Sequence, residues 1–235
     1  ERELAGYSSL LSDFERLYKE IESVSLARDY WIEVAYRNVE VLGISFNAFQ
    51  LEQAYNKGGE AAFEQVRNRA LSRLEGTFKN YSPVVDQAVF EKLMALYAEK
   101  MPKDFLPEGF DAIDFEALSK EIYTNSKMTS LEGAEELLAG TADEVMAKLD
   151  ADPAYVFGRS VHSIFYDKIE PNFPRINIEL AAVQKQYMKA LMDVFPDSRF
   201  FPDANSTLRV NYGMIQGYSP KDGVYYTDKT YLKGV

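Results

Sequence analysis

Hydrophobic residues recur at helical spacing through most of the chain. Leu4, Tyr7, Leu11, Phe14, Tyr18 and Ile21 follow one another at steps of three and four, which places them on one face of a helix. The same spacing predicts a second helix from about Leu26 towards Tyr55 that ends at Gly58 and Gly59, a third from Phe63 to Phe78, and a last long one through Ile176 and Val194. Because each apolar face needs a partner, this pattern predicts a bundle of helices.

Helix start signals divide the middle of the chain into shorter helices. In Ser82–Pro83 and Asp152–Pro153, a capping side chain precedes a proline at the first helical position. Thr129 with Glu132, and Thr141 with Glu144, have the spacing of a capping box. We therefore expect helices from Pro83 to Met101, from Asp111 to about Tyr123, after Thr129, after Thr141, and from Asp152 to about Ile169.

The pattern changes after Pro202. The runs Thr207–Val210 and Gly223–Thr227 are short, rich in β-branched and aromatic residues, and separated by turn residues, so they predict two strands. Two short strands are marginal alone, and we expect them to pair with a neighbouring copy or to pack on the chain's own helices.

The expected fold class is mainly α, with an irregular helical bundle in residues 1–200 and a short β segment in residues 201–235. The apolar residues expected to be buried in the bundle are Trp31, Phe46, Phe63, Phe90, Tyr187, Leu11 and Leu93.

Composition and charge exclude several kinds of protein. The chain has 235 residues, no cysteine, and 37 acidic against 26 basic side chains, which gives a net charge of -11. The acidic excess lies in residues 1–196, because residues 197–235 hold five basic and four acidic side chains. Such a charge disfavours nucleic acids and anionic membranes as partners. No apolar run reaches about 18 residues, so no membrane insertion is predicted. The lack of cysteine excludes a disulfide scaffold and leaves the redox compartment open.

Recognisable catalytic motifs are missing from the sequence. There is one histidine, His162, so a metal site with two imidazole ligands is excluded within the chain. The Gly-x-Ser-x-Gly motif, the phosphate loop, the dinucleotide loop and the calcium loop are also absent. A lone histidine among apolar helical residues is more often structural than catalytic. We therefore expect no cofactor, no metal and no catalytic residue in this chain.

One stretch near the C-terminus carries a specific signal. Residues 201–213, Phe-Pro-Asp-Ala-Asn-Ser-Thr-Leu-Arg-Val-Asn-Tyr-Gly, and residues 217–226, Gly-Tyr-Ser-Pro-Lys-Asp-Gly-Val-Tyr-Tyr, resemble a signature of the bacterial dipeptidyl-peptidase 7 and dipeptidyl-peptidase 11 family. Residues 27–37 and 230–235 also resemble segments of that family. The signature residues are Pro202, Asp203, Asn205, Ser206, Thr207, Arg209, Gly213, Tyr218 and Pro220.

The resemblance implies a chymotrypsin-like serine exopeptidase, in which a helical domain is inserted as a lid between two β-barrels. Such enzymes release dipeptides from free peptide N-termini. In the family the catalytic His and Asp precede the helical insertion, and the nucleophilic Ser follows the strands that begin here. None of these positions matches this sequence, so Ser160 and His162 inherit no catalytic role.

The resemblance thus predicts that this chain is a helical lid with the first strands of the second barrel. The parent enzyme would act on peptides in the periplasm or at the cell surface of a Gram-negative bacterium. The two ends of this chain fit a piece of a longer protein that is inactive by itself. Its strands are expected either to pair with a neighbouring copy, which would give a homodimer, or to pack on the chain's own helices.

Two other interpretations stay open. The chain is alternatively a non-catalytic helical protein that binds a peptide or serves as a scaffold. The signature residues themselves fit a structural role, in which Asp203 and Asn205 bond local backbone and Gly213 and Gly217 permit tight conformations. Arg209 is then available to pair with an acidic helix surface.

Overall fold

A computed structural model describes residues 7–229 and 231–234. The chain divides into two units, Glu1–Leu191 and Met192–Val235, which we describe separately. The helices are α1 (Leu10–Tyr30), α2 (Glu40–Phe78), α3 (Pro83–Lys100), α4 (Phe115–Asn125), α5 (Leu131–Leu138), α6 (Ala142–Asp150), α7 (Pro153–Ile164) and α8 (Asn172–Val194). Trp31–Asn38 and Phe165–Ile169 are π-helical, and the strands are β1 (Tyr218–Lys221) and β2 (Val224–Tyr226). The expectation of a mainly helical fold with a short β segment is confirmed.

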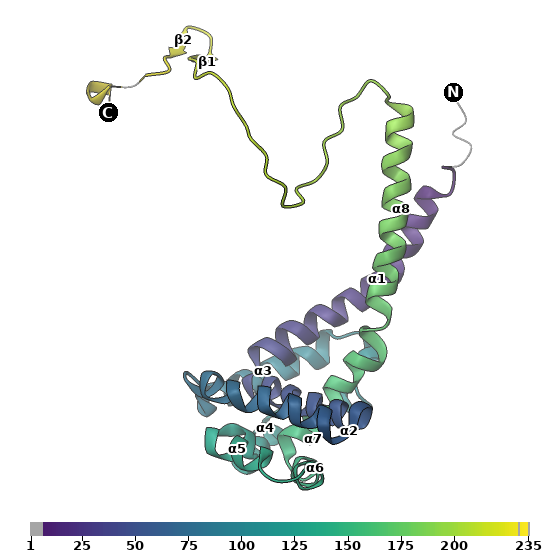
Figure 1. The fold of residues 1–235 in the computed structure, drawn as a ribbon, viewed down its shortest axis with the longest axis vertical. Coiled ribbons are helices and arrows are strands. Elements are labelled where there is room, and N and C mark those ends of the chain that lie inside the picture. The colour runs from purple at the N-terminus through teal and green to yellow at the C-terminus, as the bar shows by residue number, and fades with distance from the viewer. Residues whose placement is uncertain (1–6, 230, 235) are drawn as a thin grey trace. The chain divides into compact units, whose positions relative to one another are not determined.

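Helices α1 and α8 run side by side in opposite directions (Figure 1). The rings of Phe14 and Tyr187 meet edge to face at 5.9 Å, and Arg16 forms an ion pair with Glu179 at 3.7 Å. The buried seam of α1 runs through Leu10, Leu17 and Val24, with partly buried Phe14 and Ile21 between them. Its alternating steps of four and three are those of antiparallel coiled-coil packing.

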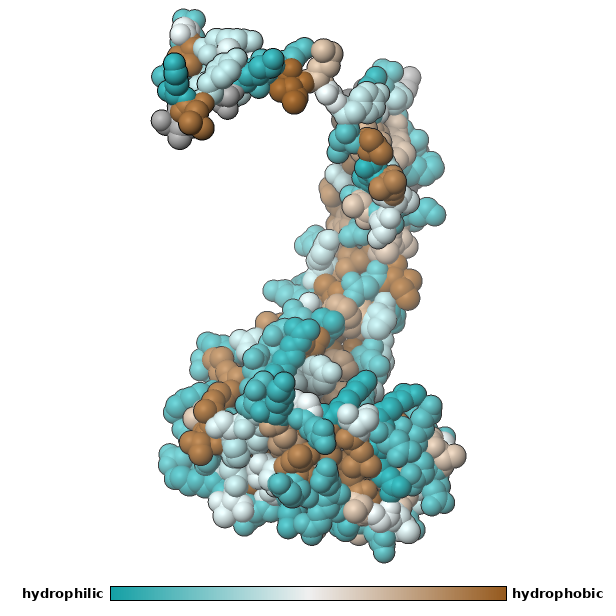
Figure 2. Space-filling view, turned by 60° about the vertical axis from the view of Figure 1, so that its left-hand side comes forward, coloured by the Kyte–Doolittle hydropathy of each residue, from teal (hydrophilic) through white to brown (hydrophobic). Residues whose placement is uncertain are grey.

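This seam corrects the predicted face of the first helix. Phe14 and Ile21 belong to both candidate stripes, but Leu11 is 78% exposed and Tyr18 is 53% exposed. Tyr187, expected to be buried, is 43% exposed. Figure 2 shows hydrophobic side chains at the surface along this helix pair. Contact with a single partner helix covers only one of the two apolar stripes of α1.

Helix α2 bends sharply at Gly59. Its φ of 64° and ψ of -158° lie in a region that is almost restricted to glycine. Asn47 and Arg73 line the same small cavity, although a straight helix would separate residues 26 positions apart by about 39 Å. The two limbs of α2, residues 40–58 and 60–78, therefore face each other, and the predicted helix break at the glycine pair is confirmed.

The start of α2 differs from the prediction of one helix from Leu26 towards Tyr55. The chain is π-helical after Trp31 and becomes extended at Val39, with φ -104° and ψ 99°. The buried carboxylate of Asp86 in α3 accepts the backbone N–H groups of Glu40 and Val41 at 2.7 and 2.9 Å. The helix is thus capped from another element, which no local pattern reveals.

The shorter helices follow their capping residues. Asp152 accepts the N–H groups of Ala154 and Tyr155, and Thr141 with Glu144 forms the predicted capping box. Two starts differ from the prediction: Ser130 rather than Thr129 caps α5, and Asp114 caps α4 after a 3-10 turn, so that helix does not begin at Asp111.

The core of the first unit joins all of its helices. Trp31, Phe46, Phe63 and Phe90 are buried as expected, and Leu93 is partly buried against the same cluster. None of the helices in the described residues is long and apolar enough to cross a membrane.

In the second unit, β1 and β2 form an antiparallel hairpin that pairs Tyr218 with Tyr226. The strand predicted at Thr207–Val210 is wrong, because the backbone there is irregular. Leu208 is 94% exposed and Val210 is 76% exposed, so their β-branched and apolar side chains find no neighbouring strand that would fix the conformation. The first strand lies instead in the segment that we assigned to a turn.

Candidate functional site

A buried serine–histidine pair joins α2 to α7. The Oγ atom of Ser45 lies 3.0 Å from Nε2 of His162, which is also 3.1 Å from the backbone oxygen of Leu42. Both side chains are fully buried. Since a serine beside a histidine is the arrangement of a nucleophile and its base, the protonation of this imidazole decides what the pair can do.

The neighbours of His162 fix its tautomer. The indole N–H of Trp31 donates to Nδ1 at 3.3 Å, so Nδ1 carries a lone pair and the hydrogen belongs on Nε2. Nε2 therefore faces Ser45 as a donor and cannot take its proton. Burial lowers the pKa of His162 to about 3, which keeps the ring neutral. Ser45 donates to the carbonyl of Leu42 at 2.8 Å.

This arrangement assigns His162 a structural role. It connects α2, α7 and the π-helical segment through three hydrogen-bonded groups in a site closed to solvent. Gly158 permits the close approach of the two helices, because a Cβ atom there would collide with Ser45. Ser160 is not part of the cluster, since its hydroxyl donates to the carbonyl of Phe157 at 2.7 Å. Among the described residues, no group of three or more His, Cys, Asp or Glu side chains could hold a metal ion.

The signature residues form a locally bonded, exposed segment of the second unit. The side-chain oxygen of Asn205 accepts from the backbone N–H of Thr207 at 3.3 Å and from its hydroxyl at 2.7 Å. The Arg209 guanidinium donates to the carbonyl oxygens of Pro202 and Asp203 at 3.1 and 2.7 Å. Arg209 thus closes a loop on its own backbone.

The remaining signature residues are less closely connected. Ser206 has a positive φ of 66°, the only such non-glycine residue in the described part of the chain. Tyr218 contacts Tyr226 across the hairpin at 5.5 Å between ring centroids, and Pro220 lies in β1. A Cβ atom at Gly217 would collide with Tyr225, whereas Gly213 has open space around it and a φ that other residues adopt.

A groove between the two limbs of α2 is a candidate binding site that the sequence patterns did not indicate. It has a volume of about 490 Å³, and its apolar lining residues are small. Its polar lining residues are Asn47, Gln50, Gln53, Lys57, Arg69, Arg73 and Tyr166. No acidic side chain lines it, although acidic residues outnumber basic ones in the chain as a whole.

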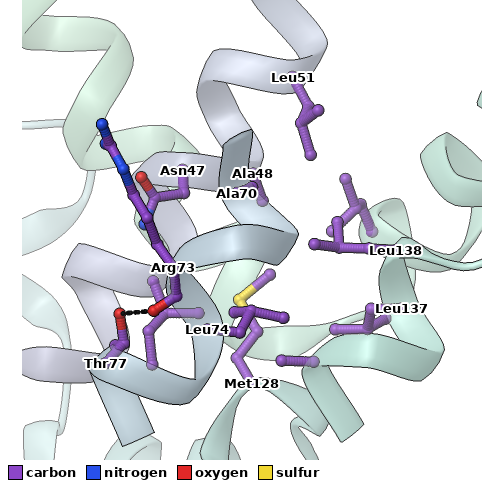
Figure 3. A pocket seen from close by; sticks show the side chains of 13 residues that line it. Asn47, Ala48, Leu51, Ala70, Arg73, Leu74, Thr77, Met128, Leu137 and Leu138 are labelled. Atoms are coloured by element: carbon purple, nitrogen blue, oxygen red, sulfur yellow. Dashed lines mark hydrogen bonds between the residues drawn. The ribbon is translucent and has the colours of Figure 1, made fainter. Parts of the chain in front are cut away.

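Figure 3 shows a small, mainly apolar cavity that shares Asn47, Ala70 and Arg73 with this groove. The guanidinium of Arg73 lies beside the amide of Asn47 and points away from Leu137 and Leu138. The signal that could have located the groove is the spacing of Arg69 and Arg73, four residues apart on one limb. It becomes meaningful only once the second limb folds against the first.

The whole chain matches one protein family, and named relatives cover nearly all of it. The family model described as Peptidase S46 matches residues 1–235. An Asp/Glu-specific dipeptidyl-peptidase of Flavobacterium psychrophilum is 41% identical over 228 residues, which cover 97% of this chain and 32% of that protein. A protein of the same name from Capnocytophaga gingivalis is 39% identical over 98% of this chain and 33% of its own length.

A third relative bears the other name found among these proteins. Dipeptidyl-peptidase 7 of Phocaeicola vulgatus is 26% identical over 95% of this chain and 32% of its own length. The chain spans about a third of the length of the curated relatives it matches.

Proposed function

Because the chain belongs to the peptidase S46 family, we propose that it forms the helical lid, with the first strands of the following barrel, of a serine dipeptidyl-peptidase. The parent enzyme removes dipeptides from free peptide N-termini. A lid of this kind admits one extended peptide end, excludes bulk water and limits how far the substrate enters. The family match over residues 1–235 is the single observation that carries this proposal.

The geometry of the histidine supports a lid without its own chemistry. His162 is the only histidine of the chain, and its protonated Nε2 faces Ser45 in a site closed to solvent. A general base needs a lone pair directed at the nucleophile and access to substrate. In this proposal the triad therefore comes from parts of the parent enzyme outside residues 1–235.

The relatives also suggest a substrate class. The two relatives near 40% identity are named Asp/Glu-specific dipeptidyl-peptidases, whereas the relative named dipeptidyl-peptidase 7 is 26% identical. We therefore propose that the parent enzyme cleaves after acidic residues. We also propose a periplasmic or cell-surface location for the parent enzyme, as the family resemblance implies; the relatives come from bacteria.

Activity measurements on two lengths of protein test the proposal. The 235-residue chain should neither release dipeptides nor react with a serine-directed phosphonate. The full-length enzyme should release dipeptides that end in Asp or Glu from a free N-terminus, and N-acetylation of the substrate should abolish this release. Ser160→Ala in the full-length enzyme serves as a control and should leave the rate unchanged.

Two results would contradict the proposal. Stoichiometric labelling of a serine in the 235-residue chain would show a nucleophile within it. Release of single amino acids by the full-length enzyme would exclude a dipeptidyl-peptidase. The competing function, a peptide-binding scaffold without catalysis, predicts no hydrolysis at either length.

A further inference from the structure

We propose that the groove between the limbs of α2 binds an extended peptide segment with acidic side chains at alternate positions. Arg69 and Arg73 would hold the two carboxylates, with Lys57 nearby, and the amides of Asn47, Gln50 and Gln53 would line the peptide backbone. The inference rests on the proposed function only in identifying this peptide as part of a substrate of the parent enzyme.

The first argument is the ion pairing of the arginines. In the described residues of the first unit, Arg16, Arg28, Arg37, Arg67, Arg159 and Arg175 all form ion pairs. In that same part of the chain, Arg69 and Arg73 are the two arginines for which no ion pair is found, and both line the groove. A chain with 37 acidic residues thus leaves two neighbouring guanidinium groups available to an anion from outside.

The second argument is spacing. Arg69 and Arg73 are four residues apart on one helix face, which is a rise of about 6 Å along the axis. Side chains on one side of an extended peptide repeat every second residue, at about 6.6 to 6.8 Å. Two carboxylates in an acidic-x-acidic sequence therefore match the two guanidinium groups, and carboxylates three residues apart fit less well.

The third argument is the shape and polarity of the walls. Asn47, Gln50 and Gln53 follow at steps of three on the opposite limb, and amides can both donate to and accept from a peptide backbone. The small side chains of Ala54, Ala62 and Ala70, which also line the groove, leave room for a peptide main chain. The net charge of -11 disfavours a nucleic acid with its many phosphates.

Peptide binding to the 235-residue chain tests the inference directly. We would measure fluorescence anisotropy with a labelled peptide Ala-Asp-Ala-Asp-Ala, the same peptide with Asn for Asp, and one with its two Asp residues three positions apart. The first peptide should bind at least tenfold more tightly than the Asn peptide at low salt, and more tightly than the respaced one. The double variant Arg69→Gln, Arg73→Gln should lower the affinity for the Asp peptide at least tenfold and so abolish its preference over the Asn peptide. Arg37→Gln, at an exposed and ion-paired position, serves as the control and should leave the preference unchanged.

Several outcomes would overturn the inference. Equal binding of the Asp and Asn peptides would remove the role of charge, and unchanged binding by the double variant would place the peptide elsewhere. Equal competition by inorganic phosphate or an oligonucleotide would show a general anion site. Circular dichroism of the double variant shows whether its fold is intact, which is expected because both side chains are exposed.

A second measurement separates this inference from the proposed function. In the full-length enzyme, the double variant should raise KM for long acidic peptides and leave kcat and KM for a short fluorogenic dipeptide substrate unchanged. An enzyme that releases no dipeptides would contradict the proposed function, while the anisotropy result would still decide the groove.

Discussion

The indole of Trp31 donates its N–H to Nδ1 of His162 across 131 positions of sequence, at 3.3 Å. The bond fixes the imidazole hydrogen on the nitrogen that faces Ser45 and so determines that this serine–histidine pair is structural. Because both rings are buried, loss of either partner would leave an unsatisfied polar atom in the core.

The low pKa of His162 predicts a specific pH dependence of stability. The folded state holds the pKa near 3 and the unfolded state near 6.5, so the unfolded state binds more protons between these values. The free energy of unfolding should therefore fall as the pH drops below about 6.5, with a slope of up to about 1.4 kcal/mol per pH unit from this group. Above that pH the contribution is fully present.

Urea denaturation followed by circular dichroism at pH 7, 6 and 5 would measure this slope, with His162→Gln as the comparison. The carboxylates contribute equally to the pH dependence of stability of both proteins. The stability difference between wild type and variant should therefore shrink as the pH falls. Parallel curves would show that the imidazole is not buried in its neutral form.

The bend in α2 predicts opposite effects for two glycines of the same helix. Gly59→Ala should destabilise the fold by about 1 to 3 kcal/mol, because alanine is strained at a φ of 64° and a ψ of -158°. Gly76→Ala should be neutral or stabilising by up to about 1 kcal/mol, since Gly76 is helical with open space around it. Thermal unfolding of both variants checks the pair, and equal effects would contradict the bend.

Replacement of Asp86 should destabilise the fold more than replacement of an exposed acidic residue. It accepts from two backbone N–H groups at the start of α2 and from the hydroxyl of Tyr123 at 2.6 Å. Asp86→Ala should cost on the order of 3 kcal/mol, because these buried and partly buried donors lose their acceptor. Asp111→Ala, at an exposed position, should change stability by less than about 0.5 kcal/mol. Chemical denaturation of both variants measures the difference.

The packing of α1 against α8 predicts which leucine of α1 contributes to stability. Leu17→Ala should cost about 2 to 5 kcal/mol, because Leu17 is fully buried. Leu11→Ala should cost less than about 0.5 kcal/mol in the chain as described. A large loss at Leu11 in a concentration-dependent melt would instead show that a second molecule covers that stripe.

Periodicity and capping chemistry account for most helix positions. Glycine at positions 58 and 59, Asp152 before Pro153, and Thr141 with Glu144 act through their own backbone, so local sequence predicted these boundaries. The family resemblance also came from local sequence, in the run from Pro202 to Pro220. It was confirmed by the match to Peptidase S46 over residues 1–235.

The choice between local alternatives needed the tertiary structure. Two apolar stripes on α1 are equally periodic, and only contact with α8 selects Leu17 over Leu11. The start of α2 depends on Asp86, 46 positions away from Glu40. A strand at Thr207–Val210 needs a neighbouring strand to accept its hydrogen bonds, and β propensity alone supplies none.

The sequence by itself determined that the chain is mainly helical, acidic and without a recognisable catalytic motif, because composition and periodicity are properties of neighbouring residues. Only the tertiary structure decided that His162 presents a hydrogen to Ser45, and that Arg69 and Arg73 face amides of the other limb across a groove. These relationships depend on residues that folding brings together. Asn47 and Arg73 are 26 positions apart in the sequence, and Trp31 and His162 are 131 apart. Distances of that kind are set by packing, which no local pattern encodes.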